Sequence, residues 1–176
     1  KSNFLGMDIN RLRHVITPTI AYSYQHTPTV PSSKLKQMDS IDSINGTSQS
    51  ATFELSNKLQ TKRSGENVDM LDFRVSTAYT FKPKAGDKRG SSFSDILFNL
   101  ELLPYSWLRI VGDSTLRHSG NKNDQLYGKF VNGNVDFAFD FGKDRQFGIG
   151  NRYERKGGNS MTYTLKWRVS PKWKFY

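Results

Sequence analysis

The sequence predicts an all-β chain, and within that class a segment of an antiparallel up-and-down transmembrane β-barrel, with about eight to nine strands of a larger barrel. Three observations predict this fold. Apolar and polar residues alternate with a period of two, as they do on the two faces of a β-strand. The connections between these stretches alternate in length. Aromatic residues gather where the stretches end, as in the interfacial girdles of membrane barrels.

The alternation is clearest from residue 71 to residue 81. Odd positions there hold Leu71, Phe73 and Tyr79, whereas Asp72 and Arg74 occupy even positions. Comparable alternation covers residues 96–102, 135–141 and 161–169, and weaker alternation covers residues 16–24, 53–59, 108–116 and 147–153. A ninth strand is expected to begin at Trp173. Strands of about ten residues have the length that a tilted strand needs to cross a bilayer.

The connections between the expected strands alternate between long and short. Long polar connections are expected at residues 26–50, 82–92 and 119–132, and short turns at residues 64–67, 104–106, 142–145, 156–159 and 170–172. The long connections follow odd-numbered strands, with the turn at Gly157-Gly158 as the exception. Membrane barrels sort their connections in this way, with long loops outside the cell and short turns in the periplasm.

A soluble β-sandwich or lipocalin-like barrel would also alternate, with its aromatic face turned inward. Strands of globular proteins average only about five or six residues, which is shorter than the stretches found here. A sandwich core would also place aromatic residues in the middle of strands rather than at their ends. The residues expected at a membrane interface are Tyr22, Tyr24, Tyr79, Phe81, Trp107, Tyr163, Trp167 and Trp173.

The opposite face of the strands would line the interior of the barrel. Its polar residues are expected to form a solvated surface of compensating charges, or to contact an amphipathic cargo or a plug. The candidates for this lumen-facing set are Arg74, Lys58, Glu101, Arg109, Asp136, Arg152, Lys166 and Arg168.

The composition restricts the classes of partner and site. The formal net charge is +10, which suits a polyanionic partner such as anionic lipid headgroups or an acidic glycolipid. Lys and Arg are spread through every strand rather than collected in one stripe, so no nucleic-acid partner is predicted. The chain contains no cysteine, which excludes disulfides and thiolate metal sites. No run of eighteen apolar residues exists, so no transmembrane helix is expected.

Residues with the usual chemistry of catalysis do not form recognisable motifs. His14, His26 and His118 have neither the spacing of a metal site nor that of a catalytic triad. Asp39 and Asp42 are not followed by the Gly and Glu of a calcium-binding loop. The sequence therefore predicts neither an enzyme nor a cofactor or metal site.

One block of sequence is more specific than barrel patterning. It comprises Arg13-His14-Val15-Ile16-Thr17-Pro18-Thr19-Ile20-Ala21-Tyr22-Ser23-Tyr24, a polar loop with Asp39-Ser40-Ile41-Asp42, and residues 53–63, which contain Asn57-Lys58-Leu59. This block resembles the C-terminal barrel of the LptD (OstA) family, the lipopolysaccharide-assembly proteins of the outer membrane. The likeness extends over the chain, although its specific motifs lie within the first 63 residues.

The resemblance implies a barrel that inserts lipopolysaccharide into the outer leaflet of a Gram-negative-type cell outer membrane. The implied partners are lipopolysaccharide, a plug lipoprotein (LptE-like), outer-membrane lipids and the rest of the barrel. The family's periplasmic jelly-roll domain and its cysteines have no counterpart in these residues. Pro18 within a strand weakens pairing locally, which suits either a seam that opens or a Pro tolerated at a bulge.

Two other functions remain open at this stage. One is a generic porin or adhesin-type barrel that passes small solutes, and the other is a soluble β-sandwich that binds a ligand. The chain begins without a signal-peptide pattern and ends within an expected strand, so we expect residues 1–176 to be one partial barrel domain, a fragment of a longer chain. So few strands cannot close the large barrel expected of the family.

Overall fold

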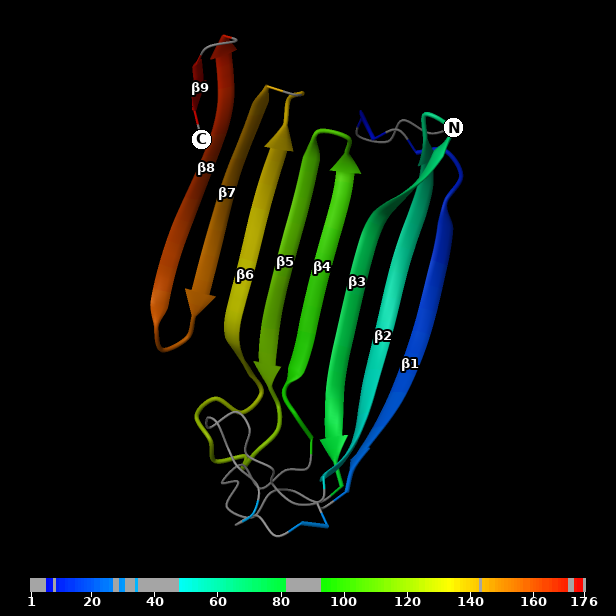
Figure 1. The fold of residues 1–176 in the computed structure, drawn as a ribbon, viewed down its shortest axis with the longest axis vertical. Helices are drawn as coiled ribbons and strands as arrows, with labels where there is room; N and C mark the ends of the chain where they lie inside the picture. The colour runs from blue at the N-terminus through cyan, green and yellow to red at the C-terminus, as the bar shows by residue number, and fades with distance from the viewer. Residues whose placement is uncertain are drawn as a thin grey trace.

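The computed structural model describes residues 6–7, 9–26, 29–30, 34, 48–81, 93–142, 144–170 and 173–175. They form one antiparallel sheet in which every strand pairs with its neighbours in sequence, from β1 to β9 (Figure 1). The strands are β1 (Arg13–Gln25), β2 (Ser48–Arg63), β3 (Glu66–Thr80), β4 (Ile96–Tyr105), β5 (Leu108–Arg117), β6 (Lys129–Asp140), β7 (Arg145–Glu154), β8 (Gly158–Ser170) and the short β9 (Trp173–Phe175). The all-β prediction and the antiparallel meander are confirmed.

The predicted strands all appear, but several boundaries differ. The expected long connections at residues 26–50 and 119–132 are shorter, because β2 begins at Ser48 and β6 at Lys129. The turn predicted at residues 104–106 lies instead at Ser106-Trp107, since Pro104 and Tyr105 continue β4. The sorting by length holds, with residues 26–47, 81–95 and 118–128 joining strands at one end. Residues 82–92 and most of residues 26–47 lie outside the described residues.

The turn between β2 and β3 shows how the short connections are made. Only Ser64 and Gly65 separate the two strands, and their φ angles are 52° and 90°. Two successive positive φ angles are the geometry of the type I′ turn, whose twist matches that of the flanking strands. Gly65 adopts this conformation without the steric cost that a Cβ atom would bring.

The register runs through Pro18 without a shift, and Pro18 stands opposite Leu55. The alternative of a bulge at this proline is therefore wrong. β1 is an end strand of the described sheet, so a residue without an N–H is tolerated where that position faces away from β2. The bulge in this region lies between β2 and β3 instead, where Leu59 pairs with Leu71 and Gln60 with Asp69, leaving Met70 without a partner in the register.

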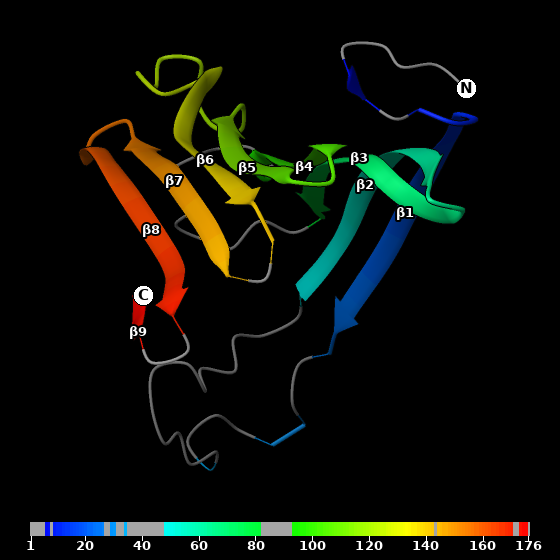
Figure 2. The same cartoon turned by 90° about the horizontal axis from the view of Figure 1, so that it is seen from above.

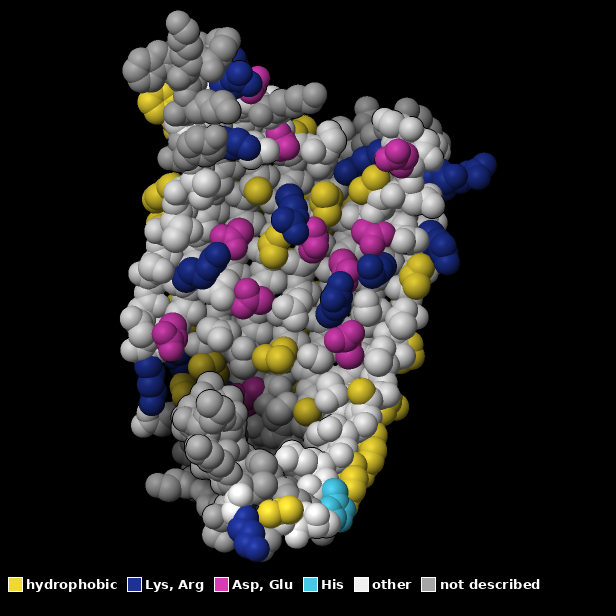
Figure 3. Space-filling view, in the orientation of Figure 1, with side chains coloured by type: hydrophobic (Ala, Val, Ile, Leu, Met, Phe, Trp, Pro, Cys, Tyr) yellow, Lys and Arg dark blue, Asp and Glu magenta, His cyan; other side chains and the backbone are white. Residues whose placement is uncertain are grey.

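The sheet bends into an open trough with β1 on one side and β8 and β9 on the other (Figure 2). The concave side carries charged residues of both signs, as seen in Figure 3 from the viewpoint of Figure 1. Large apolar residues lie on the convex side. Examples are Ile20, which is 72% exposed, and Tyr163, which is 65% exposed.

The described residues contain almost no apolar core. Ala51 and Met70 are the buried apolar residues among them, and the buried Thr61 exchanges hydrogen bonds through its hydroxyl with the backbone of Asn10. A single sheet has no second layer against which to bury its apolar face. The described ranges also hold no helix with the length and apolarity needed to cross a membrane.

Candidate functional site: the concave polar face

The register places the predicted lumen-facing residues on one face of the sheet. Cross-strand partners share a face, and residues two apart along a strand do so as well. One belt of polar side chains crosses the sheet at mid-height from β1 to β8: Thr17, Ser56, Arg74, Asn99, Asp113, Asn134, Arg152 and Ser160. Lys58, Glu101 and Asp136 lie in the adjacent row, and Arg109, Lys166 and Arg168 lie beyond it on the same face. Whether this face lines a lumen stays a prediction.

On β2 and β3 the polar face carries a connected cluster of charges. Lys58 Nζ lies 3.0 Å from Asp69 Oδ2 and 3.1 Å from Asp72 Oδ2. Arg74 donates to both carboxylate oxygens of Asp72, at 3.0 Å from Nε and 2.8 Å from Nη2. Gln60 donates to Asp69 at 2.7 Å. The bulge at Met70 brings Asp69 beside Lys58, because it shifts the register by one residue between the two aspartates.

Further ion pairs lie on this face between β4 and β8. Arg109 Nε lies 2.7 Å from Glu101 Oε1, and Arg152 Nη2 lies 2.6 Å from Asp136 Oδ2. Arg168 pairs more loosely with Asp144, at 4.0 Å. Among the described residues, every member of the predicted lumen-facing set except Lys166 takes part in an ion pair. Seven of these eight charges are therefore compensated by a neighbour of opposite sign.

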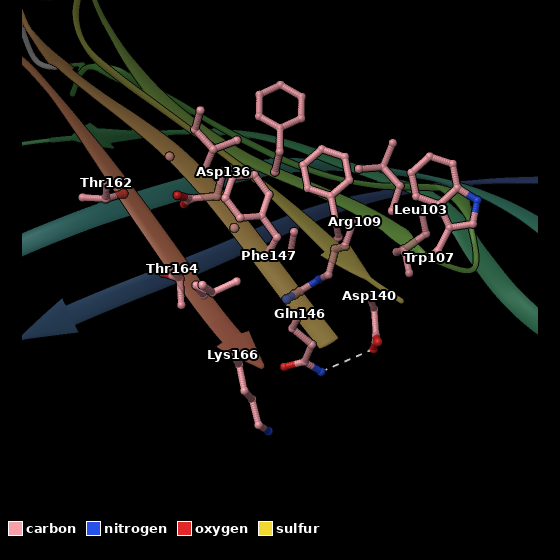
Figure 4. A pocket seen from close by; sticks show the side chains of 18 of the residues that line it. Leu103, Trp107, Arg109, Asp136, Asp140, Gln146, Phe147, Thr162, Thr164 and Lys166 are labelled. Atoms are coloured by element: carbon pink, nitrogen blue, oxygen red, sulfur yellow. Dashed lines mark hydrogen bonds between the residues drawn. The ribbon is translucent and has the colours of Figure 1, made fainter. Parts of the chain in front are cut away.

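A depression of about 690 Å³ lies on the polar face over β6, β7 and β8. Ala138, Gly148 and Gly150 line its floor, where small residues leave space between longer neighbours. Figure 4 shows Asp140, Gln146 and Lys166 toward one end of it and Asp136 and Thr162 toward the other. The Gln146 amide donates to the Asp140 carboxylate at 3.4 Å.

Gly150 lies directly beneath the Asp136–Arg152 ion pair. A Cβ atom at this position would collide with Asp136 Oδ1 and would lie 2.6 Å from Thr162 Oγ1. The sequence did not predict this depression. It shows that Gly148 and Gly150 are two residues apart, but only the register between β6 and β7 shows that Ala138 lies on the same face.

Aromatic rings form two clusters on the convex face, one at each end of the strands. At the short-turn end, Trp107 stacks on Tyr105 at 5.0 Å between ring centroids and contacts Phe139 and Phe141 at 6.3 Å. The Arg145 guanidinium lies 6.0 Å from the Trp167 ring at the same end. We call this group the short-turn aromatic cluster.

At the long-connection end, Phe81 lies 6.1 Å from Tyr22 and 5.1 Å from Tyr79, and Tyr79 lies 4.8 Å from Phe93. Tyr24 lies near the same end of β1, where it is 52% exposed. The predicted position of these aromatic residues near strand ends is therefore met by Tyr22, Tyr24, Tyr79, Phe81, Trp107 and Trp167.

Tyr163 does not lie at a strand end. It stands in the middle of β8 opposite Ile149, so the prediction of a terminal position for it is wrong. The alternation predicted the face of Tyr163 correctly. It placed Tyr163 near the start of the strand because the predicted stretch began at residue 161, whereas β8 begins at Gly158. Trp173 begins β9, and its side chain lies outside the described residues. Tyr105, Phe139 and Phe141 also belong to the short-turn aromatic cluster but were not among the predicted interfacial residues, although each flanks a short turn.

Within the described ranges, no group of His, Asp or Glu side chains could hold a metal ion. Comparison of the chain with protein-family models, with curated proteins and with solved structures finds no match. Functional inference therefore depends on the geometry and on the sequence patterns themselves.

Proposed function

We propose that this chain is part of the wall of a transmembrane β-barrel whose concave face lines the lumen. The observation that carries the proposal is a convex face of exposed apolar residues with an aromatic cluster at each end. Water would penalise so much exposed apolar surface, whereas the hydrocarbon of a bilayer would not. A sandwich would need a second sheet to cover this face, and the described residues supply one sheet.

The spacing of the aromatic residues supports a bilayer as the surrounding medium. On β6, Phe130 lies near the long-connection end and Phe139 near the short-turn end. A strand covers about 30 Å over this interval at about 3.3 Å per residue. Tilting by about 40° reduces the depth to about 23 Å, close to the apolar band of about 25 Å in outer-membrane barrels.

Within this class, the function proposed is insertion of lipopolysaccharide into the outer leaflet, as part of a larger outer-membrane translocon barrel. Support comes from the resemblance of residues 13–63 to the LptD family and from the end strands β1 and β9, which pair on one side only. Such edges call for further strands, because unpaired edges promote aggregation. A plug lipoprotein and the rest of the barrel are the proposed partners.

The charges of the polar face refine the electrostatic part of this proposal. A lumen rich in free cations would attract the anionic headgroup strongly, but the cations of this face are mostly paired with carboxylates. A face of paired charges and amides offers hydrogen bonds to sugars without holding a phosphate tightly. It suits the passage of a glycolipid headgroup rather than its retention.

A porin-type pore is the second candidate, because a hydrated face with compensating charges also suits small solutes. A photo-crosslinking residue in place of Thr164, beside the depression, separates the two in the full-length parent protein. Newly synthesised lipopolysaccharide should be captured at this position if the barrel transports it, and a plug lipoprotein should co-purify. A pore would give neither result but would make proteoliposomes permeable to sugars.

The barrel itself is tested by extraction of the full-length parent from membranes. A transmembrane barrel should require detergent and should migrate differently on a gel before and after heating. A parent protein that stays soluble and monodisperse without detergent would contradict both candidates.

A further inference from the structure

Three cations lie beside the long connections at the ends of β6 and β7, outside the ion pairs of the polar face. Lys129 begins β6, and Arg155 and Lys156 follow β7 in the turn to β8. All three side chains are exposed, and among the described residues none of them has an ion-pair partner. This contrasts with the paired cations of the strand interiors.

The backbone brings these cations together at the long-connection end of the sheet. The Arg155 N–H donates to the Val131 carbonyl at 2.8 Å, two residues after Lys129. Glu154 is the neighbouring acid, and its carboxylate lies close to Gly157 in the same turn. Lys129, Arg155 and Lys156 therefore leave an excess of positive charge at this rim, and we call the three residues the basic rim.

Aromatic side chains lie next to the basic rim on the convex face. Phe130 is 51% exposed and pairs in register with Leu116, and Tyr153 is 42% exposed and pairs with Gly133. Aromatic rings favour the boundary between hydrocarbon and headgroups, so cations one to three residues farther along the chain reach the headgroup layer.

We infer that the basic rim binds the phosphate groups of phosphorylated lipids in the leaflet that faces the long connections. The inference rests on the proposed function, since it requires the convex face to contact lipid. Free cations beside an aromatic boundary match a lipid that has an anionic head and apolar chains. Each such cation near an anionic membrane surface contributes about a five-fold change in lipid association.

The test uses the full-length parent protein in nanodiscs that contain neutral phospholipid with a minor fraction of lipid A, or of its dephosphorylated form. Native mass spectrometry counts the lipids that remain bound. The wild type should enrich lipid A over the dephosphorylated form, and added salt should reduce the preference. The variant that combines Lys129→Gln, Arg155→Gln and Lys156→Gln should lose this preference. The enrichment of lipid A should fall about five-fold for each cation removed.

A matched variant with Arg11→Gln, Arg13→Gln and Lys62→Gln removes the same charge at the opposite end of the strands. It should keep the preference for lipid A. Equal losses in the two variants, or no preference in the wild type, would overturn the inference. Competition by inorganic phosphate at the concentration of lipid A would also overturn it, because the site would then bind free phosphate. A wild-type protein that inserts into neither kind of bilayer would contradict the proposed function instead.

Discussion

The two faces of the sheet are made by the same strands and yet differ in almost every physical property. Along β8, Tyr163 and Leu165 are exposed on the convex face, whereas Thr162, Thr164 and Lys166 lie on the concave face with the ion pairs and the depression. Neither face is buried against other described residues. The proposed barrel accounts for this difference, because it places hydrocarbon on the convex side and water on the concave side of a single layer of strands.

The largest expected effect comes from exchanging these environments at one position. In the full-length barrel folded into bilayers, Tyr163→Arg should cost about 2–4 kcal/mol of unfolding free energy, because it places a charge in the middle of the apolar band. Thr164→Arg, one residue away on the concave face, should change it by less than about 0.5 kcal/mol. Denaturant titration measures both, and equal costs would remove the distinction between the faces.

The short-turn aromatic cluster should be the next most sensitive feature. Trp107→Ala removes stacking on Tyr105 and contacts with Phe139 and Phe141, for an expected loss of about 2 kcal/mol. Trp107→Phe should retain most of the stability because a ring remains at the interface. An unchanged midpoint for Trp107→Ala in the same titration would show that the cluster does not anchor the sheet.

On the concave face, the floor of the depression makes a smaller test. Gly150→Ala forces Asp136 and Thr162 to move and should cost about 1 kcal/mol through the disturbed ion pair with Arg152. Gly148→Ala is the matched control, because its nearest neighbour would be Thr164 Cβ at 3.5 Å. If the two alanine variants have the same unfolding free energy, Gly150 has no special role.

The pairing of concave-face charges should have the smallest effect. Glu101→Gln and Arg109→Gln, alone and combined, form a double-mutant cycle for a pair in which both side chains are well exposed. The coupling should be about 0.2–1 kcal/mol and should fall as salt is added. A coupling of several kcal/mol that resists salt would mean that this face is buried rather than hydrated.

The fold followed from the sequence because period-two alternation is a local signal. Leu71, Phe73 and Tyr79 identify a face without any knowledge of their neighbours, and loop lengths depend only on where strands end. The pair of Arg74 with Asp72 can also be predicted from the sequence, because residues two apart on a strand share a face. Boundaries such as Ser48 and Lys129 were missed because polar residues continue the strands beyond the apolar pattern.

The details of the concave face depend on register, which the pattern does not determine. Asp69 reaches Lys58 because of the bulge at Met70, and Asp136 reaches Arg152 because β6 and β7 align Asn134 with Arg152. Contacts between strands therefore required the structure.

The most direct measurement of the central claim is the accessibility of single cysteines along β8, since the chain contains no cysteine of its own. In the full-length barrel in bilayers, cysteines at Thr162, Thr164 and Lys166 should react with a water-soluble maleimide. Spin labels at Met161, Tyr163 and Leu165 should instead be relaxed by oxygen and not by a water-soluble nickel complex. Strict alternation of these results is predicted, and uniform reactivity along β8 would contradict a sheet that separates lipid from water.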